Sequence, residues 1–378
     1  MTDLPPTSAS SGASSRSIKS DSIDSTLEES LITPNSCYQR RIKRTVKIFQ
    51  VIFALAGFVL LVVQIVQGIM ALNSGRGISF NIAIGCCVAI ALMLIARPPV
   101  LNNAIARFAH RSRYRSFQRY VFILPFFMAA LVIWAKLKIG PTSDEWRYVS
   151  SEGSLSEYGT AIVYLLIPAF AYPMMRQFRK EQKRFLSLYY GLFAFAAFFV
   201  GMEEISWGQR LIGFEEPEFI SKHNVQSEFT LHNLSFYQNH LLHDSFLLAG
   251  FIGSFCWIAL RYWQRKQKRK VDHSQPETSG IKIAADRSIN SNIDPNIDPS
   301  YVLPDWFLSS YFYPIFIFYL ALDYTDLRSR FDFLHHADQE HWEFVMSLGV
   351  LLFVMIKFFE QGKAVDSAAR ESVVKTKF

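Results

Sequence analysis

Blocks of apolar residues about as long as a membrane is thick dominate this sequence. They run roughly over residues 46–72, 79–97, 119–139, 158–175, 185–202, 244–263, 306–322 and 342–359. A helix of about 20 apolar residues crosses the roughly 30 Å of hydrocarbon in a bilayer, and it satisfies its own backbone groups there. A membrane β-barrel would show alternating segments of about ten residues instead. The sequence therefore predicts an all-α, polytopic transmembrane helix bundle of about eight spans.

Composition and charge agree with a membrane protein rather than a nucleic-acid-binding one. Half of the 378 residues are apolar and 19% are charged, whereas a soluble domain has about 25% charged residues. The net charge of +7 comes from Lys and Arg that flank the apolar blocks, and no nucleic-acid-binding motif accompanies them. We therefore expect the protein to have the lipid bilayer as its partner and not to bind nucleic acid. The sequence leaves protein partners open.

The distribution of basic residues predicts the orientation. When the segments between spans are counted alternately from the N-terminus, 31 of the 39 Lys and Arg residues fall on one side and 8 on the other. Basic residues concentrate on the cytoplasmic side of membrane proteins. Both termini are therefore predicted to be cytoplasmic.

The same pattern divides the chain into five parts. A disordered cytoplasmic tail (1–42) precedes six spans (43–263), which include an outer-face motif loop (203–243). A disordered cytoplasmic linker (264–305), the last two spans (306–360) and a cytoplasmic tail (361–378) follow. The tail and the linker have the polar composition typical of disorder.

The first chemically suggestive motif is Gly201-Met-Glu-Glu-Ile-Ser-Trp-Gly-Gln-Arg210, at the outer end of the fifth block. If the helix continues through this motif, Glu203 and Trp207 share one of its faces at i, i+4. Adjacent carboxylates beside an apolar span are costly unless they are paired, protonated or metal-bound. We predict catalytic roles for Glu203, Glu204 and Arg210, and substrate-binding roles for Trp207 and Gln209. The simpler alternative is a helix end in water, with Arg210 as the charge partner.

Histidines form the second motif, since seven of the nine lie in the predicted outer segments. His240, His243 and Asp244 stand at i, i+3 and i+4, a spacing that suits metal ligands or a histidine oriented by a carboxylate. With His232 they form our predicted divalent-metal site, and the neighbouring Asn233 is a predicted substrate-binding residue. Interfacial hydrogen bonding explains the same residues without a metal.

Two acidic stretches complete the outer face. His336, Glu340 and Glu343 fall on one helical stripe that enters the last span, and we predict that they bind substrate. The Glu-x-x-His pattern of di-metal helices is not met there, and capping with charge pairing to arginines is the alternative. Ser154 and Glu157 fit a capping box at the start of the fourth span.

The Glu203–Arg210 core, the Pro217-Glu-Phe219 that follows and the later Leu231-His-Asn233 resemble a group of bacterial multi-pass inner-membrane proteins. The likeness is good over roughly residues 140–250 and loose elsewhere. No activity is attached to that group, so the resemblance implies a fold type and a bacterial inner membrane and nothing catalytic.

Three functions remain open from the sequence, and whether the protein is an enzyme stays uncertain. The first is a metal-dependent hydrolase or transferase acting on a lipid or lipid-linked substrate at the outer face. The second is a transporter of a small solute, since ionisable residues and Pro-broken helices mark transport paths. The third is a non-catalytic assembly or sensor protein that recruits partners through its tail and linker.

Overall fold

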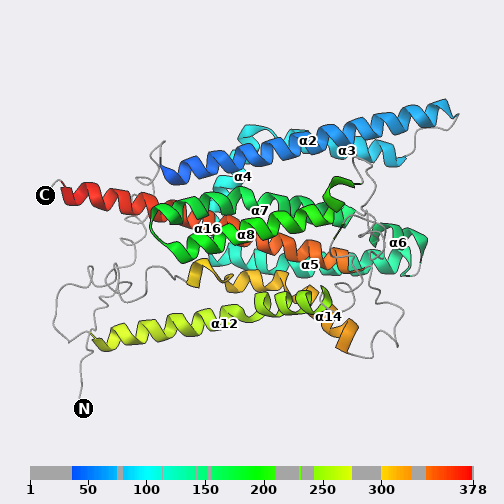
Figure 1. Cartoon of the computed structure of the whole chain (residues 1–378). Helices are drawn as coiled ribbons and strands as arrows, with labels where there is room; N and C mark the ends of the chain where they lie inside the picture. Colours follow the sequence, from blue (N-terminus) through cyan, green and yellow to red (C-terminus); the bar gives the residue numbers. More distant parts are fainter. Residues whose placement is uncertain are drawn as a thin grey trace, which may run out of the picture. The chain divides into compact units, whose positions relative to one another are not determined.

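The computed structural model describes residues 36–74, 80–112, 114–141, 143–150, 155–209, 230, 242–274, 299–324 and 338–376. Within these ranges every regular element is a helix (Figure 1), which confirms the predicted all-α class for this part of the chain. Most of the predicted disordered tail (1–42) and much of the predicted linker (264–305) lie outside the described residues.

Six of the helices are long and apolar enough to cross a membrane. They are α2 (Cys37–Asn73), α5 (Arg115–Ile139), α7 (Leu155–Lys180), α8 (Arg184–Glu204), α12 (Leu242–Ser274) and α16 (Gln339–Thr376). Their length and composition are compatible with an integral, multi-pass membrane protein. Helix α2 begins inside the predicted N-terminal tail, and α12 continues well into the predicted linker.

Two predicted spans take a different form. Residues 79–97 contain α3 (Phe80–Ile95), and its last part is bent by 69° from α4 (Pro98–Arg111), so the two count as one broken span at most. The bend falls just before Pro98, because proline disfavours the helical conformation of the residue that precedes it. The predicted count of eight spans stays a prediction.

The predicted span 306–322 is also interrupted. It consists of the 3-10 helix η4 (Trp306–Tyr311) and the short helix α14 (Tyr313–Tyr324). Pro314 has no backbone N–H to donate to the preceding turn, so one continuous α-helix cannot run through this segment with all its hydrogen bonds made.

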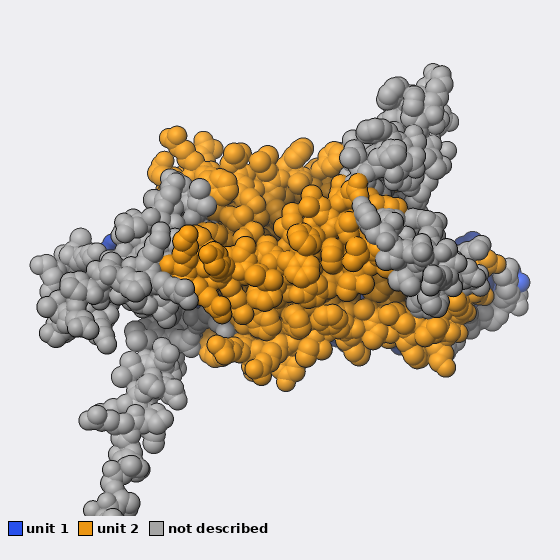
Figure 2. Space-filling view, turned by 90° about the horizontal axis from the view of Figure 1, so that it is seen from below, with its two compact units in different colours: residues 1–106, 362–378 blue, residues 107–361 orange. Residues whose placement is uncertain are grey.

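The chain forms two compact units (Figure 2). Unit 1 consists of residues 1–106 and 362–378, and unit 2 of residues 107–361. Helix α16 contributes to both. In unit 1, Ser36 caps α2, and the Asp366 carboxylate of α16 accepts hydrogen bonds from the backbone N–H groups of Cys37 and Tyr38 at 2.7 and 2.9 Å.

Helix α16 is the most buried of the six candidate spans. Of the 18-residue apolar stretch of α16, 72% is buried inside the protein, compared with 44% of the corresponding stretch of α7 and 17% of that of α5. Helices α7 and α8 pack side by side as an antiparallel pair joined by a three-residue turn (Figure 1). Large apolar side chains on the other spans remain exposed, as expected for surfaces that face lipid.

Helices α12 and α14 also run antiparallel. His243 near the start of α12 contacts Tyr319 of α14, whereas Phe255 further along α12 contacts Tyr313. Gly253 of α12 lies directly against the ring of Phe312, where an added Cβ would come within 2.3 Å of ring carbons. The absence of a side chain therefore permits this close approach.

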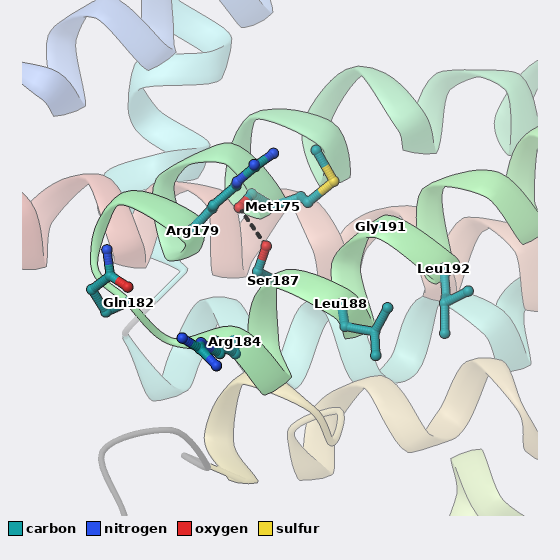
Figure 3. Close-up of a pocket in the computed structure, with 8 residues that line it drawn as sticks. All are labelled: Met175, Arg179, Gln182, Arg184, Ser187, Leu188, Gly191 and Leu192. Atoms are coloured by element: carbon teal, nitrogen blue, oxygen red, sulfur yellow. Dashed lines mark hydrogen bonds between the residues drawn. The ribbon is translucent and has the colours of Figure 1, made fainter.

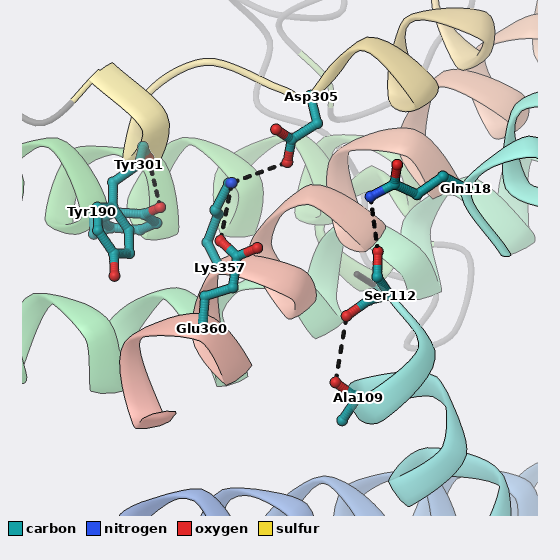
Figure 4. A network of polar contacts seen from close by, with 8 residues as sticks. All are labelled: Ala109, Ser112, Gln118, Tyr190, Tyr301, Asp305, Lys357 and Glu360. Atoms are coloured by element: carbon teal, nitrogen blue, oxygen red, sulfur yellow. Dashed lines mark hydrogen bonds and ion pairs between the residues drawn. The ribbon is translucent and has the colours of Figure 1, made fainter. Parts of the chain in front are cut away.

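The segment that leads into η4 is tied to the bundle by polar contacts (Figure 4). Asp305 accepts a hydrogen bond of 2.9 Å from the buried Lys357 ammonium of α16, which also donates to Glu360 at 3.0 Å. The 3-10 helix η3 (Pro299–Tyr301) is held by the Tyr190 hydroxyl, which donates to the Tyr301 carbonyl at 2.7 Å. Residues 299–305 are thus structured, although the sequence predicts that they belong to the disordered linker.

Candidate functional site

Three glutamates meet where α8 ends and α16 begins. Each of Glu204, Glu340 and Glu343 offers a carboxylate oxygen, and these oxygens lie within 4.8 Å of one another. Glu204 is the last residue of α8, and Glu340 stands in the first turn of α16, where the helix dipole favours negative charge. Glu343 follows at i+3, on the same face of α16. We call these residues the carboxylate trio.

The trio is shielded from solvent. Glu340 and Glu343 keep only 7% and 5% of their surface exposed, and Glu204 is half-buried. Among the described residues, Glu343 Oε1 is buried and makes no hydrogen bond. Buried carboxylates packed together repel one another and lose hydration. Protons, a cationic side chain or a bound cation must neutralise such a group.

Further polar side chains surround the trio. Glu157 in the first turn of α7 interacts electrostatically with Glu343. Tyr164 of α7 interacts with both Glu204 and Glu343. The Tyr319 hydroxyl of α14 donates to Oε1 of Gln339, the first residue of α16, at 3.2 Å. Polar side chains of α7 thus lie close enough to the trio to act on it electrostatically.

The chain turns sharply just after the trio. Glu203 is buried and accepts a hydrogen bond of 2.5 Å from Trp207 Nε1, although α8 ends at Glu204 and does not continue to Trp207. Ser206 and Trp207, in the 3-10 helix η1 (Ser206–Gly208), have φ angles of 49° and 52°. Non-glycine residues in this left-handed region are strained and are concentrated at functional sites. The turn orients the Trp207 indole back onto α8.

A second polar cluster lies at the same end of unit 2. Asp338, which precedes α16, forms a buried ion pair with Lys136 of α5 and accepts a hydrogen bond of 3.0 Å from Trp146 Nε1 of α6 (Asp144–Ser150). His341 Nδ1 lies 2.6 Å from Ser156 Oγ of α7. His341 and Glu343 are two residues apart, about 200° around a helix of roughly 3.6 residues per turn. The two clusters therefore occupy different faces of α16.

The structure brings some predicted site residues together and leaves others apart. Glu204, Glu340 and Glu343 meet, Glu203 and Trp207 lie next to them in the chain, and half-buried Gln209 follows. Of the predicted metal ligands, His243 packs against the Tyr319 ring at 5.1 Å between centroids, while Asp244 is exposed. The remaining predicted residues lie outside the described ones: Arg210, His232, Asn233, His240 and His336.

The predicted metal set of His232, His240, His243 and Asp244 stays a prediction, because His232 and His240 lie outside the described residues. Among the described residues, the group of ligand atoms close enough to hold a cation is the trio, and not a group containing His243 and Asp244. The sequence predicts catalytic or substrate-binding roles for the trio's members. It gives no role to Lys136, Tyr164, Tyr319 or His341. Lys136 is an ionisable residue within an apolar block, and that is the signal that could have found it.

Comparisons of the chain with protein family models, with curated proteins and with solved structures gave no match.

Proposed function

We propose that this integral membrane protein binds a divalent cation through Glu204, Glu340 and Glu343. The observation that carries the proposal is the approach of three carboxylate oxygens within 4.8 Å, two of them from buried residues, at the junction of α8 and α16. A cation would neutralise the repulsion among them and satisfy Glu343 Oε1.

The ligand chemistry favours a hard cation. Mg²⁺, Mn²⁺ and Ca²⁺ prefer oxygen ligands, whereas zinc sites usually contain Cys or His. Metal–oxygen distances of about 2.1 Å for Mg²⁺ and up to 2.6 Å for Ca²⁺ place ligand oxygens at most about 4.2–5.2 Å apart. The spacing within the trio fits this range.

We further propose that the cation serves a hydrolase or transferase reaction on a lipid or lipid-linked substrate. The trio lies at the ends of two candidate spans, where the head group of a bilayer lipid would enter from the side. A divalent cation there would bind and polarise a phosphate oxygen. Glu203, held by Trp207, is our candidate general base, and Arg210 our candidate for stabilising negative charge.

The position of the trio also bears on the alternatives. A solute path through the membrane would place ionisable groups near its middle, at broken helices. The trio stands in the last turn of α8 and the first turns of α16, which favours chemistry at the interface over transport.

Cation binding to the full-length protein in lipid nanodiscs tests the proposal, with Mn²⁺ as the probe and EPR as the measurement. We expect Glu343→Gln to weaken Mn²⁺ binding at least about tenfold, because even groups that only support metal ligands contribute 10–100-fold. Glu340→Gln should act in the same way, and each substitution nearly preserves the shape of the side chain.

Two matched variants serve as controls. Glu145→Gln removes an exposed carboxylate from the first turn of α6 and should leave Mn²⁺ binding unchanged. Asp244→Asn removes a ligand of the set predicted from sequence and should also have no effect. If Asp244→Asn lost the ion while Glu343→Gln kept it, the trio would be wrong as the cation site.

The enzymatic part has a separate test. Cation-dependent release of the head group from phospholipids or lipid-linked sugars would support it, and Glu203→Gln should then lower kcat by about 10²–10⁴-fold with unchanged Mn²⁺ binding. If Mn²⁺ bound to the trio and none of these substrates was converted, a cation site without this activity would remain.

A further inference from the structure

The turn between α7 and α8 carries a hollow at the end of these helices opposite to the trio. A cavity of about 520 Å³ is lined by both helices (Figure 3), from Met175 and Arg179 on α7 to Arg184 and Leu192 on α8. A second cavity of about 570 Å³ shares Met175, Arg179 and Gln182 with it and reaches Tyr172. We call the two together the hairpin groove.

A missing side chain helps to form the groove. Gly191 of α8 lies in its wall, and a Cβ added there would be 3.1 Å from Met175 Sδ, the flexible part of that side chain. Leu188 and Leu192, one turn apart on α8, point the same way in Figure 3 and are 63% and 60% exposed. The part of the groove farther from the turn is therefore apolar and exposed at the surface.

The end of the groove nearest the turn is basic. Arg176, Arg179, Lys180 and Arg184 line it and are exposed. Within the described part of the chain, none of these four side chains forms an ion pair or hydrogen bond. The one acidic residue of the turn, Glu181, is engaged by Lys183 at 2.9 Å and by Gln177 at 2.9 Å.

On each of the two helices, basic residues near the turn are followed, along one face, by apolar or aromatic residues farther from it. Arg184, Leu188 and Leu192 stand at i, i+4 and i+8, so a single stripe on α8 runs from a cation at the helix start to two leucines further in. On α7, Tyr172, Arg176 and Lys180 form the equivalent stripe, with the cations at the helix end. A molecule with an anionic head and an apolar tail matches both stripes.

We propose that the hairpin groove is a binding site for one anionic phospholipid. Its phosphate would lie among Arg176, Arg179 and Arg184, and an acyl chain would follow Leu188 and Leu192 over Gly191. Arg is suited to phosphate because its planar guanidinium offers several donors. The sequence predicts that this end is cytoplasmic, where basic residues near the membrane surface attract anionic lipids. The site is independent of the carboxylate trio.

The test measures lipid selectivity of the full-length protein by native mass spectrometry. The protein is released from nanodiscs of equal parts phosphatidylglycerol and phosphatidylcholine, and the lipids retained are counted. We expect Arg179→Gln/Arg184→Gln to reduce the enrichment of phosphatidylglycerol at least about fivefold, since each basic residue at a membrane surface contributes about 1 kcal/mol. Added inorganic phosphate should leave the wild-type enrichment unchanged.

Two further variants separate the groove from general surface charge. Arg115→Gln/Arg119→Gln removes the same charge from exposed positions near the start of α5, which do not line the groove, and should keep the enrichment. Gly191→Leu keeps every charge but fills the groove, and should reduce lipid retention as the arginine variant does. Equal losses in both arginine pairs, or an unchanged Gly191→Leu, would overturn the proposal in favour of a diffuse surface potential. Competition by inorganic phosphate would overturn it in favour of a phosphate site.

Discussion

At the scale of single residues, the buried pair of Lys136 and Asp338 joins α5 to the start of α16. Lys136 is 3% exposed, and Asp338 also accepts the Trp146 indole N–H. Removing one partner of a buried ion pair leaves an uncompensated charge, at a cost of about 3–5 kcal/mol. We expect Lys136→Met to destabilise the protein by about this amount, measured as a lowered Tm in detergent.

The neighbouring lysine provides the control for that substitution. Lys138 lies two residues further along α5 and is exposed, so Lys138→Met should change Tm little. The double variant Lys136→Met/Asp338→Leu should recover much of the loss, because it leaves no buried charge unpaired. Equal Tm values for Lys136→Met and Lys138→Met would show that the ion pair contributes nothing to stability.

Sequence reasoning found the residues of the site more readily than their partners. Glu203 and Trp207 do make contact, but through a sharp turn after the helix end rather than through the continued helix that the i, i+4 spacing assumes. The approach of Glu204 to Glu340 and Glu343 depends on how α8 packs against α16, far apart in the sequence. No local pattern encodes that approach, and the charge distribution indicated only that these residues share one side.

At the scale of helices, the tightest contact at a described glycine of unit 2 is that of Gly253. Helix α12 meets the residue after η4 there, and an added Cβ would lie 2.3 Å from Phe312 ring carbons. We expect Gly253→Val to lower the stability by about 1–3 kcal/mol or more, as overpacking of a filled core does. Thermal unfolding, followed by the loss of monodisperse protein on gel filtration, measures the effect.

An exposed position on the same helix separates packing from helix propensity. Ala249 lies one turn before Gly253 and is exposed, so Ala249→Val introduces the same β-branched side chain without a clash. It should cost only a few tenths of a kcal/mol, the propensity difference. If both substitutions had this small effect, α12 would not pack against Phe312 as described.

The element boundaries show where hydropathy misleads. Apolar composition predicts a continuous span over 306–322, yet it is divided at Phe312 between η4 and α14, just before Pro314, which lacks the N–H needed to continue the helical hydrogen bonds from η4. The polar composition of 264–305 predicts a linker, yet α12 extends to Ser274 and Asp305 binds Lys357. The average over a window cannot register a single proline or a distant ion pair.

At the scale of the whole molecule, the pair of helices α7 and α8 joins the two proposed sites. Glu157 and Glu204 stand at one end of the pair, and Arg179 and Arg184 stand at the other. A bilayer crossed by these helices would separate the carboxylate trio from the hairpin groove. The orientation of the pair therefore decides which leaflet each proposed site faces.

The distribution of Lys and Arg predicts that the turn of the hairpin groove is cytoplasmic and that the trio faces outward. Single cysteines test this orientation in a chain whose native cysteines, all four of them free, are replaced by alanine. Glu145→Cys and Gln182→Cys place exposed thiols at the two ends of unit 2. A membrane-impermeant maleimide should label Glu145→Cys in right-side-out vesicles and Gln182→Cys only in inverted ones.

The reverse pattern would place the trio in the cytoplasmic leaflet, so its substrate would have to be a cytoplasmic lipid. Labelling of both thiols from one side would mean that the pair does not cross the membrane, and both proposed sites would then lose their lipid context.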